Sequence, residues 1–145
     1  MSPKPNDESS VKLSARRWLL EALSEKIDAN LHNKEFQMDE GWFEVDGFSQ
    51  DPPVLCEIWP QIGMPKSAQK GKIMTDAFKL LFAKTLVGED ARCILLFADE
   101  RAASPYLGST WMARCLKLHN IEVEVIEYPP EMRTRRLQTQ KRRQR

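Results

Sequence analysis

The apolar residues of this chain recur with two different periodicities, and these predict the secondary-structure elements of the fold. Between residues 11 and 31, and again between 66 and 86, apolar residues return every three or four positions, which predicts two long helices. WFEVDGF (42–48) and IEVEVIEY (121–128) alternate and predict half-buried strands. The continuously apolar runs PVLCEIW (53–59) and RCILLFAD (92–99) predict strands inside a sheet.

The segments between these elements predict how they connect. GFSQDPP (47–53) has the composition of a turn and predicts a hairpin between the flanking strands, whereas residues 32–41 are polar and are expected to be irregular. A third helix is expected from Ser109 to Leu118, after a break near Ser104-Pro105 or Gly108. The prediction is an α/β fold, a mixed central sheet with flanking helices in the order α-β-β-α-β-α-β.

Two further expectations concern the second helix. A right-handed crossover through it would place the strand at 92–99 parallel to the strand ending near Trp59. Its core stripe is expected to consist of Ile73, Met74, Ala77, Phe78, Leu81 and Phe82.

Length and composition indicate one domain. With 145 residues, 41% of them apolar and 30% charged, the chain can form one hydrophobic core. We expect a disordered N-terminus (1–10), a single domain (11–130) and a basic, disordered tail (131–145). No apolar run is long enough to span a bilayer and no secretory signal is visible, so no membrane association and a cytoplasmic location are expected. Cys56, Cys93 and Cys115 are far apart in sequence, which favours reduced core thiols over disulfides or a zinc site.

Charge is distributed unevenly along the chain. The tail holds seven of the 22 basic residues and none of the 21 acidic ones follows Glu131, so residues 1–132 carry a net charge of −6. An acidic body with a basic tail fits a nucleic-acid partner, although a solvated tail that only aids solubility fits equally well. The candidate nucleic-acid-binding residues are Arg133, Arg135, Arg136, Lys141, Arg142, Arg143 and Arg145.

Asp46 and Glu57 form the pair most indicative of chemistry. Glu57 stands in the middle of an apolar strand, where an unpaired carboxylate is costly to bury. Two carboxylates brought together across a hairpin repel each other, and a divalent cation such as Mg²⁺ or Mn²⁺ offsets that repulsion. Glu44 lies on the same strand face as Asp46 and is a further candidate. A purely structural alternative remains, in which Asp46 starts a turn and Glu57 forms an ion pair with a lysine such as Lys70.

An Asp, a turn and then a strand with Glu-x-Lys resemble the hallmark of the PD-(D/E)XK nuclease superfamily. The matching residues are Asp46 in EVDGFS and Glu57 in LCEIW, and the resemblance covers roughly residues 11–127. It implies a restriction-endonuclease-like core. The chain departs from the pattern where the lysine is expected, because that position is Trp59. Some branches supply the lysine from the following helix, and Lys70 is the preferred candidate there, with Lys72 and Gln69 as weaker ones.

The resemblance implies a metal-dependent nuclease that hydrolyses phosphodiester bonds, in DNA processing or defence. Asp46 and Glu57 would bind Mg²⁺ or Mn²⁺, with the Ile58 carbonyl as a further ligand, while Glu21 or Glu25 on the first helix would reach the metal through water. The partner would be nucleic acid, with DNA preferred, and a homodimer or a larger complex is expected. The alternative is a catalytically inactive nuclease-fold domain that binds nucleic acid or a protein partner.

Overall fold

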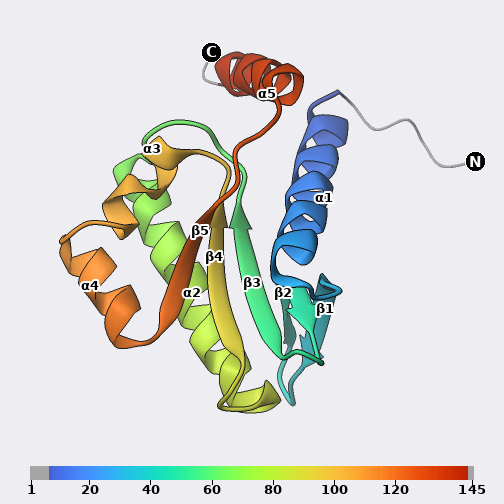
Figure 1. The fold of residues 1–145 in the computed structure, drawn as a ribbon, viewed down its shortest axis with the longest axis vertical. Helices are drawn as coiled ribbons and strands as arrows, with labels where there is room; N and C mark the ends of the chain where they lie inside the picture. Colours follow the sequence, from blue (N-terminus) through green and yellow to red (C-terminus); the bar gives the residue numbers. More distant parts are fainter. Residues whose placement is uncertain (1–6, 144–145) are drawn as a thin grey trace, which may run out of the picture.

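The two most apolar segments of the sequence form neighbouring strands inside a five-stranded mixed sheet. The computed structural model describes residues 7–143. In it β3 (Val54–Trp59) and β4 (Arg92–Phe97) pair in parallel, and every residue of β3 is buried because helices cover both faces (Figure 1). The remaining strands are β1 (His32–Gln37), β2 (Trp42–Ser49) and β5 (Ile121–Val125).

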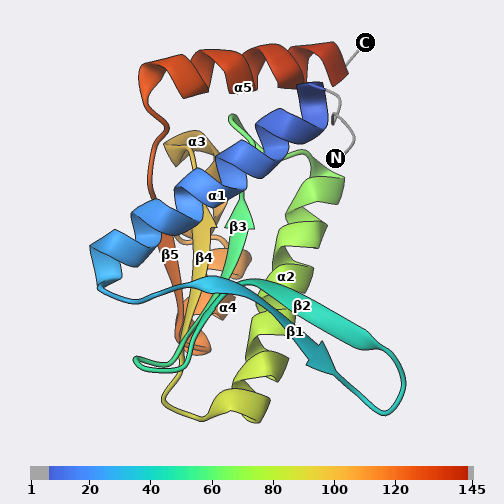
Figure 2. The ribbon, with the colours of Figure 1, turned by 90° about the vertical axis from the view of Figure 1, so that its right-hand side faces the viewer.

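The strands lie in sequence order across the sheet, β1-β2-β3-β4-β5. The pairs β1–β2 and β2–β3 are antiparallel, whereas β3–β4 and β4–β5 are parallel. Three strands therefore end at the same edge of the sheet. Figure 2 shows the β1–β2 ribbon projecting away from the body on the opposite side from β5.

Helices form a layer on each face and a cap over one end. One face carries α1, the other carries α2 to α4, and α5 crosses the edge at which the parallel strands end (Figures 1 and 2). Their bounds are α1 (Asp7–Ile27), α2 (Ser67–Val87), α3 (Glu100–Ala103), the 3-10 helix η1 (Ser104–Tyr106), α4 (Trp111–Leu118) and α5 (Pro130–Arg143).

Alternate residues of the central strands supply two hydrophobic cores. Leu55, Leu95 and Phe97 pack towards α2, together with its Ile73, Ala77 and Leu80. Cys56, Ile58, Ile94 and Leu96 pack towards α1, together with its Leu19 and Leu23. Glu57 therefore shares its strand face with Leu55 and Trp59, on the α2 side.

Several sequence expectations are confirmed. β2 and β3 form the predicted hairpin, and β3 and β4 are the predicted parallel pair connected by α2. The chain breaks after η1, and Thr110 caps α4 by accepting a hydrogen bond from the Ala113 amide. All three cysteines are unpaired, and Cys56 and Cys93 are buried as expected, whereas Cys115 is only half-buried.

No helix within residues 7–143 has the length and apolarity needed to cross a membrane.

The expected element order was incomplete. Residues 32–37 form the edge strand β1, although their polar sequence predicts an irregular segment. Its side chains are exposed or half-exposed, so HNKEFQ lacks the apolar alternation that marks a strand with one buried face. The domain therefore contains three strands, not two, between α1 and α2.

The expected terminal segments were also wrong within the described residues. Residues 7–10 belong to α1, and residues 130–143 form α5 rather than a disordered tail. Residues 1–6 and 144–145, including Arg145, lie outside the described residues. α5 is helical despite its charge because one of its faces packs on the domain, where Arg136 and Thr139 are buried.

The core face of α2 is rotated from the expected one. Ile73, Ala77, Leu80 and Ala83 are buried, whereas Phe78 is 76% and Phe82 46% exposed. The small side chains of Ala77 and Ala83 face the sheet, and the large side chains of Phe78 and Phe82 are exposed to solvent. The rotation changes which lysines of α2 face the sheet.

Candidate functional site

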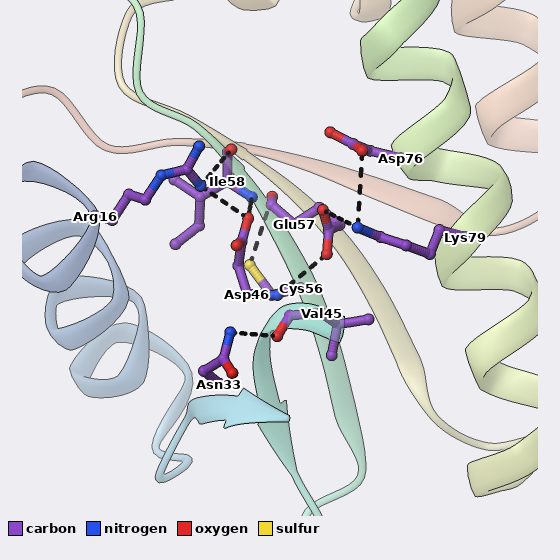
Figure 3. A network of polar contacts seen from close by, with 9 residues as sticks. All are labelled: Arg16, Asn33, Val45, Asp46, Cys56, Glu57, Ile58, Asp76 and Lys79. Atoms are coloured by element: carbon purple, nitrogen blue, oxygen red, sulfur yellow. Dashed lines mark hydrogen bonds and ion pairs between the residues drawn. The ribbon is translucent and has the colours of Figure 1, made fainter. Parts of the chain in front are cut away.

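Asp46 and Glu57 meet where β2 and β3 diverge. The ladder between these strands joins Gly47–Ser49 to Val54–Cys56, and the two carboxyl side chains follow directly after it. The Ile58 amide donates to Asp46 Oδ2 at 2.8 Å, and the Asp46 amide donates to Glu57 Oε1 at 3.1 Å (Figure 3). Each carboxylate thus takes the place of a backbone acceptor for an amide of the partner strand, which fixes the positions of both side chains.

Helix α1 approaches this point closely and brings Arg16 to Asp46. A Cβ atom at Gly47 would lie 2.6 Å from Leu20 Cδ1, so this packing requires glycine or a shift of the leucine. Arg16 Nη1 lies 3.1 Å from Asp46 Oδ2 and 3.5 Å from the Ile58 carbonyl oxygen (Figure 3). A single cationic nitrogen therefore contacts two oxygen atoms of the site.

Helix α2 supplies a second cation from the opposite face of the sheet. Lys79 Nζ lies 3.1 Å from Glu57 Oε2 and 3.9 Å from Asp76 Oδ1. The Glu57 side chain is only 5% exposed, whereas that of Asp46 is 24% exposed. Solvent and ligands therefore reach the pair from the Asp46 side.

The electrostatics show that these cations do not fully compensate the acidic groups. Burial, and then the negative charge of Asp46, raise the pKa of Glu57 to about 8, although Lys79 opposes this rise. Burial also raises the pKa of Asp76. The pKa of the Cys56 thiol is raised well above its usual value by burial, followed by Asp46 and Glu57. A further positive charge at this site would be stabilised.

The oxygen atoms of the site fit a small hard cation. Within residues 7–143, no three or more His, Cys, Asp or Glu side chains form a metal cluster, so protein carboxylates could supply only part of a coordination shell. Mg²⁺ is commonly held by one or two carboxylates and retained waters. Asp46 Oδ2 and the Ile58 carbonyl already share one positive atom, the Arg16 nitrogen, which would have to move to admit a metal.

The expected ion pair between Glu57 and a lysine is present, but Lys70, the preferred candidate, is not the lysine that forms it. Lys79 forms this ion pair, and Lys70 is nine residues earlier on α2, about 13 Å along the helix axis. Gln69 uses its side-chain oxygen to accept from the Lys66 amide at the helix start, and Lys72 is exposed. The error follows from the rotated core face of α2.

The two outer acidic candidates are both exposed. Glu21 is exposed on α1, in a shallow depression shared with Trp18, Ala22 and Glu25. Glu44 is exposed on β2, opposite Glu35 of β1. Arg16 is the α1 side chain that reaches Asp46.

The basic residues of α5 divide into two groups. Arg133 pairs with Asp99 at 3.2 Å and Arg136 is 1% exposed, so these two residues belong to the contact between α5 and the domain. Arg135, Lys141, Arg142 and Arg143 are exposed. The expectation of seven equivalent phosphate-binding residues is therefore corrected for Arg133 and Arg136.

Arg16, Asp76 and Lys79 were not identified from the sequence. The spacing of Ile73, Ala77, Leu80 and Ala83 was the available signal for Asp76 and Lys79. A helix that buries these four residues against the sheet also directs Asp76 and Lys79 towards the sheet. Arg16 has no comparable local signal, since its contact depends on the packing of α1. No protein-family model, curated protein or solved structure matches this chain in the three comparisons made.

Proposed function

We propose that the protein is a metal-dependent nuclease with a restriction-endonuclease-like core, related to the PD-(D/E)XK superfamily. The juxtaposition of Asp46 and Glu57 at the divergence of a β-hairpin carries this proposal, because it is the arrangement that the resemblance implies. The order of α1, the β2–β3 hairpin, α2 and β4 supports it as well.

Asp46, Glu57 and the Ile58 carbonyl are the groups that would hold Mg²⁺ or Mn²⁺. When bound, the metal supplies a Lewis acid that lowers the pKa of water and stabilises charge on a phosphate. The raised pKa of Glu57 supports this assignment, since a buried carboxyl group beside a second carboxylate requires a cation to ionise at neutral pH.

Lys79 is the residue that we assign to the role of the missing strand lysine. The superfamily lysine would stand at Trp59, on the same strand face as Glu57, and Lys79 reaches that carboxylate from α2. Its ammonium group donates hydrogen bonds and can orient a water beside Glu57 Oε2 or stabilise negative charge on a phosphate oxygen.

A second candidate function is a nuclease-fold domain that binds nucleic acid or a protein partner without cleavage. The contacts of Arg16 favour it, because one guanidinium nitrogen contacts both Asp46 Oδ2 and the Ile58 carbonyl. An internal cation there stabilises the fold without a metal. The buried Trp59 at the lysine position favours it too.

Cleavage of labelled DNA and RNA with Mg²⁺ or Mn²⁺ tests the nuclease proposal. Glu57→Gln should abolish cutting, and Lys79→Gln should reduce its rate at least about 100-fold, as expected for loss of a charge-stabilising donor. Lys70→Gln is the matched control on the same helix and should cut like the wild type. A folded protein that cuts no substrate with either metal would refute the nuclease proposal.

Metal binding separates the two candidates independently of cleavage. For a nuclease, calorimetry should detect Mn²⁺ binding, and Arg16→Gln should tighten it by about tenfold because a competing cation is lost. Arg17→Gln removes an exposed charge from the neighbouring position and should leave the affinity unchanged. Absence of Mn²⁺ binding in both wild type and Arg16→Gln would favour the non-catalytic domain.

The proposal includes the cellular setting. DNA is the proposed partner, bound by the protein as a homodimer or as a subunit of a larger complex. The cytoplasm is the proposed location, where reducing conditions keep the three unpaired cysteines as thiols.

A further inference from the structure

A polar pocket is lined by residues from the carboxyl end of β3, the loop that follows it, the beginning of α2 and α5. Figure 2 shows α5 passing over the beginning of α2. Its volume is about 260 Å³, and its lining includes Trp59, Gln61, Lys66, Gln69, Gln140 and Arg143. Neither Asp nor Glu is among the lining residues. Crevices outside the carboxyl ends of strands are common ligand sites in open α/β sheets.

Hydrogen bonds between distant segments hold the walls of the pocket. The side-chain amide of Gln140 donates to the Ile62 carbonyl at 2.9 Å and accepts from the Ile62 amide at 2.7 Å. The Gly63 amide donates to Asp99 Oδ2 at 2.8 Å, and the other oxygen of Asp99 pairs with Arg133. The acidic group nearest in these contacts is therefore already paired, and the pocket is preformed.

The charged residues that line the pocket, Lys66 and Arg143, are both basic. Helix α2 begins at its rim with Lys66 at the N-cap and has no acidic residue in its first turn. A helix N-terminus disfavours cations, so this arrangement is unfavourable in the absence of a negative ligand. Arg143 adds a second basic residue to the lining. One face of α5 carries Arg136, Gln140 and Arg143, and Arg136 is buried with no hydrogen-bond partner for its guanidinium among the described residues.

Trp59 provides an independent indication of a ligand. It lines the pocket, is 8% exposed, and its buried Nε1 has no acceptor within the described part of the chain. A buried donor without a partner costs about 1–3 kcal/mol, so a movement of the ring that brings Nε1 to an acceptor in the pocket would be favourable. Cationic side chains, amide donors and an unpaired indole N–H together select an oxyanion.

We propose that this pocket binds a phosphate group of a nucleic-acid strand. This inference rests on the proposed nuclease function for the identity of the ligand. Trp59 follows Glu57 by two residues on the same strand face, a separation of about 7 Å. A phosphate held beside Trp59 and Lys66 would guide the strand towards the carboxylate pair, so the pocket would position the substrate.

Nuclear magnetic resonance of the indole N–H groups tests the pocket directly. Full-length protein in EDTA is titrated with inorganic phosphate, and with a thymidine tetranucleotide with or without a 5′-phosphate. Trp59→Phe keeps an aromatic ring and identifies the Trp59 resonance by its loss. That resonance should shift with phosphate, whereas the resonance of Trp111, exposed on α4, should stay in place. An unmoved Trp59 resonance with all three ligands would overturn the proposal.

The tetranucleotides distinguish the two sources of phosphate. Tighter binding of the 5′-phosphorylated form would assign the pocket to a strand end, whereas equal binding with the same Trp59 shift would assign it to an internal phosphodiester. Lys66→Gln should weaken phosphate and tetranucleotide binding about five- to tenfold and lower the salt dependence by about one unit of slope. Lys117→Gln makes the same charge change on the exposed surface of α4 and should have no such effect. Equal behaviour of the two variants would overturn the proposal.

Because these measurements contain no divalent metal, they are separate from the nuclease test. Phosphate binding without cleavage in the presence of Mn²⁺ would support the phosphate site and refute the nuclease activity. Cleavage without any shift of the Trp59 resonance would support the nuclease activity and refute the phosphate site.

Discussion

The surroundings of Glu57 change its pKa in opposite directions, and the net change can be measured from the pH dependence of the free energy of unfolding. Its burial and its neighbour Asp46 favour the protonated form, while the ion pair with Lys79 favours the ionised form, and the pKa of about 8 shows that burial and Asp46 prevail. Between the ordinary pKa of 4.5 and about 8, the folded protein therefore holds a proton that the unfolded chain has lost. Glu57 contributes less stability as the pH rises through this interval.

Glu57→Gln should remove this pH dependence. In EDTA, the free energy of unfolding of the variant should rise relative to wild type between pH 5 and pH 8, by up to about 1.4 kcal/mol per pH unit, because the neutral amide has no proton to lose. Urea unfolding at pH 5, 6.5 and 8 measures the difference. Glu89→Gln, an exposed carboxylate after α2, should show no such trend. A constant difference for Glu57→Gln would contradict the assigned pKa.

The sequence could predict one half of this site and not the other. Asp46 and Glu57 belong to one hairpin, so strand alternation and a short turn were enough to bring them together. Lys79 depends on the rotation of α2 about its axis, and the large Phe78 and Phe82 suggested the wrong rotation. Arg16 depends on how α1 packs against β2, which no local pattern encodes.

At the scale of elements, α5 is part of the fold, and Gln140 is its main polar contact with the loop after β3. Its two hydrogen bonds to Ile62 satisfy a backbone N–H and a backbone carbonyl of a buried residue. The charge run of this segment suggested a disordered tail, because eleven of its fourteen residues are polar or charged and they form no hydrophobic stripe. Polar side chains such as Gln140 attach α5 to the domain, and contacts of this kind produce no hydrophobic periodicity in the sequence.

Gln140→Ala should therefore destabilise the protein by about 1–3 kcal/mol, since it leaves the buried Ile62 amide without its acceptor. Gln138→Ala, an exposed residue of the same helix, should change stability by less than about 0.5 kcal/mol. Urea unfolding of both variants beside wild type measures the contrast. Equal effects would mean that α5 is held by its apolar contacts alone.

At the scale of the whole molecule, the basic residues of α5 lie in two different environments. Arg133 and Arg136 face the domain, whereas Arg135, Lys141 and Arg142 are exposed on α5. A rigid helix fixes the spacing of the exposed cations, which a disordered tail would not. The carboxylate pair and the exposed side of α5 belong to one domain, so under the proposed function these cations would attract DNA to the molecule that carries the acidic site.

Replacing Arg135, Lys141 and Arg142 together by Gln should weaken binding to DNA and lower the slope of log K against log salt by about 2 to 3, because three phosphate contacts are lost. The melting temperature should stay the same, since these side chains are exposed. Fluorescence anisotropy at several salt concentrations, with an active-site variant to prevent cleavage, measures the slope. A control that replaces Lys117, Arg101 and Glu100 by Gln removes three exposed charges elsewhere and should leave the slope unchanged. If the α5 variant kept the wild-type slope, DNA would have to approach another surface, and the exposed cations of α5 would serve solubility alone.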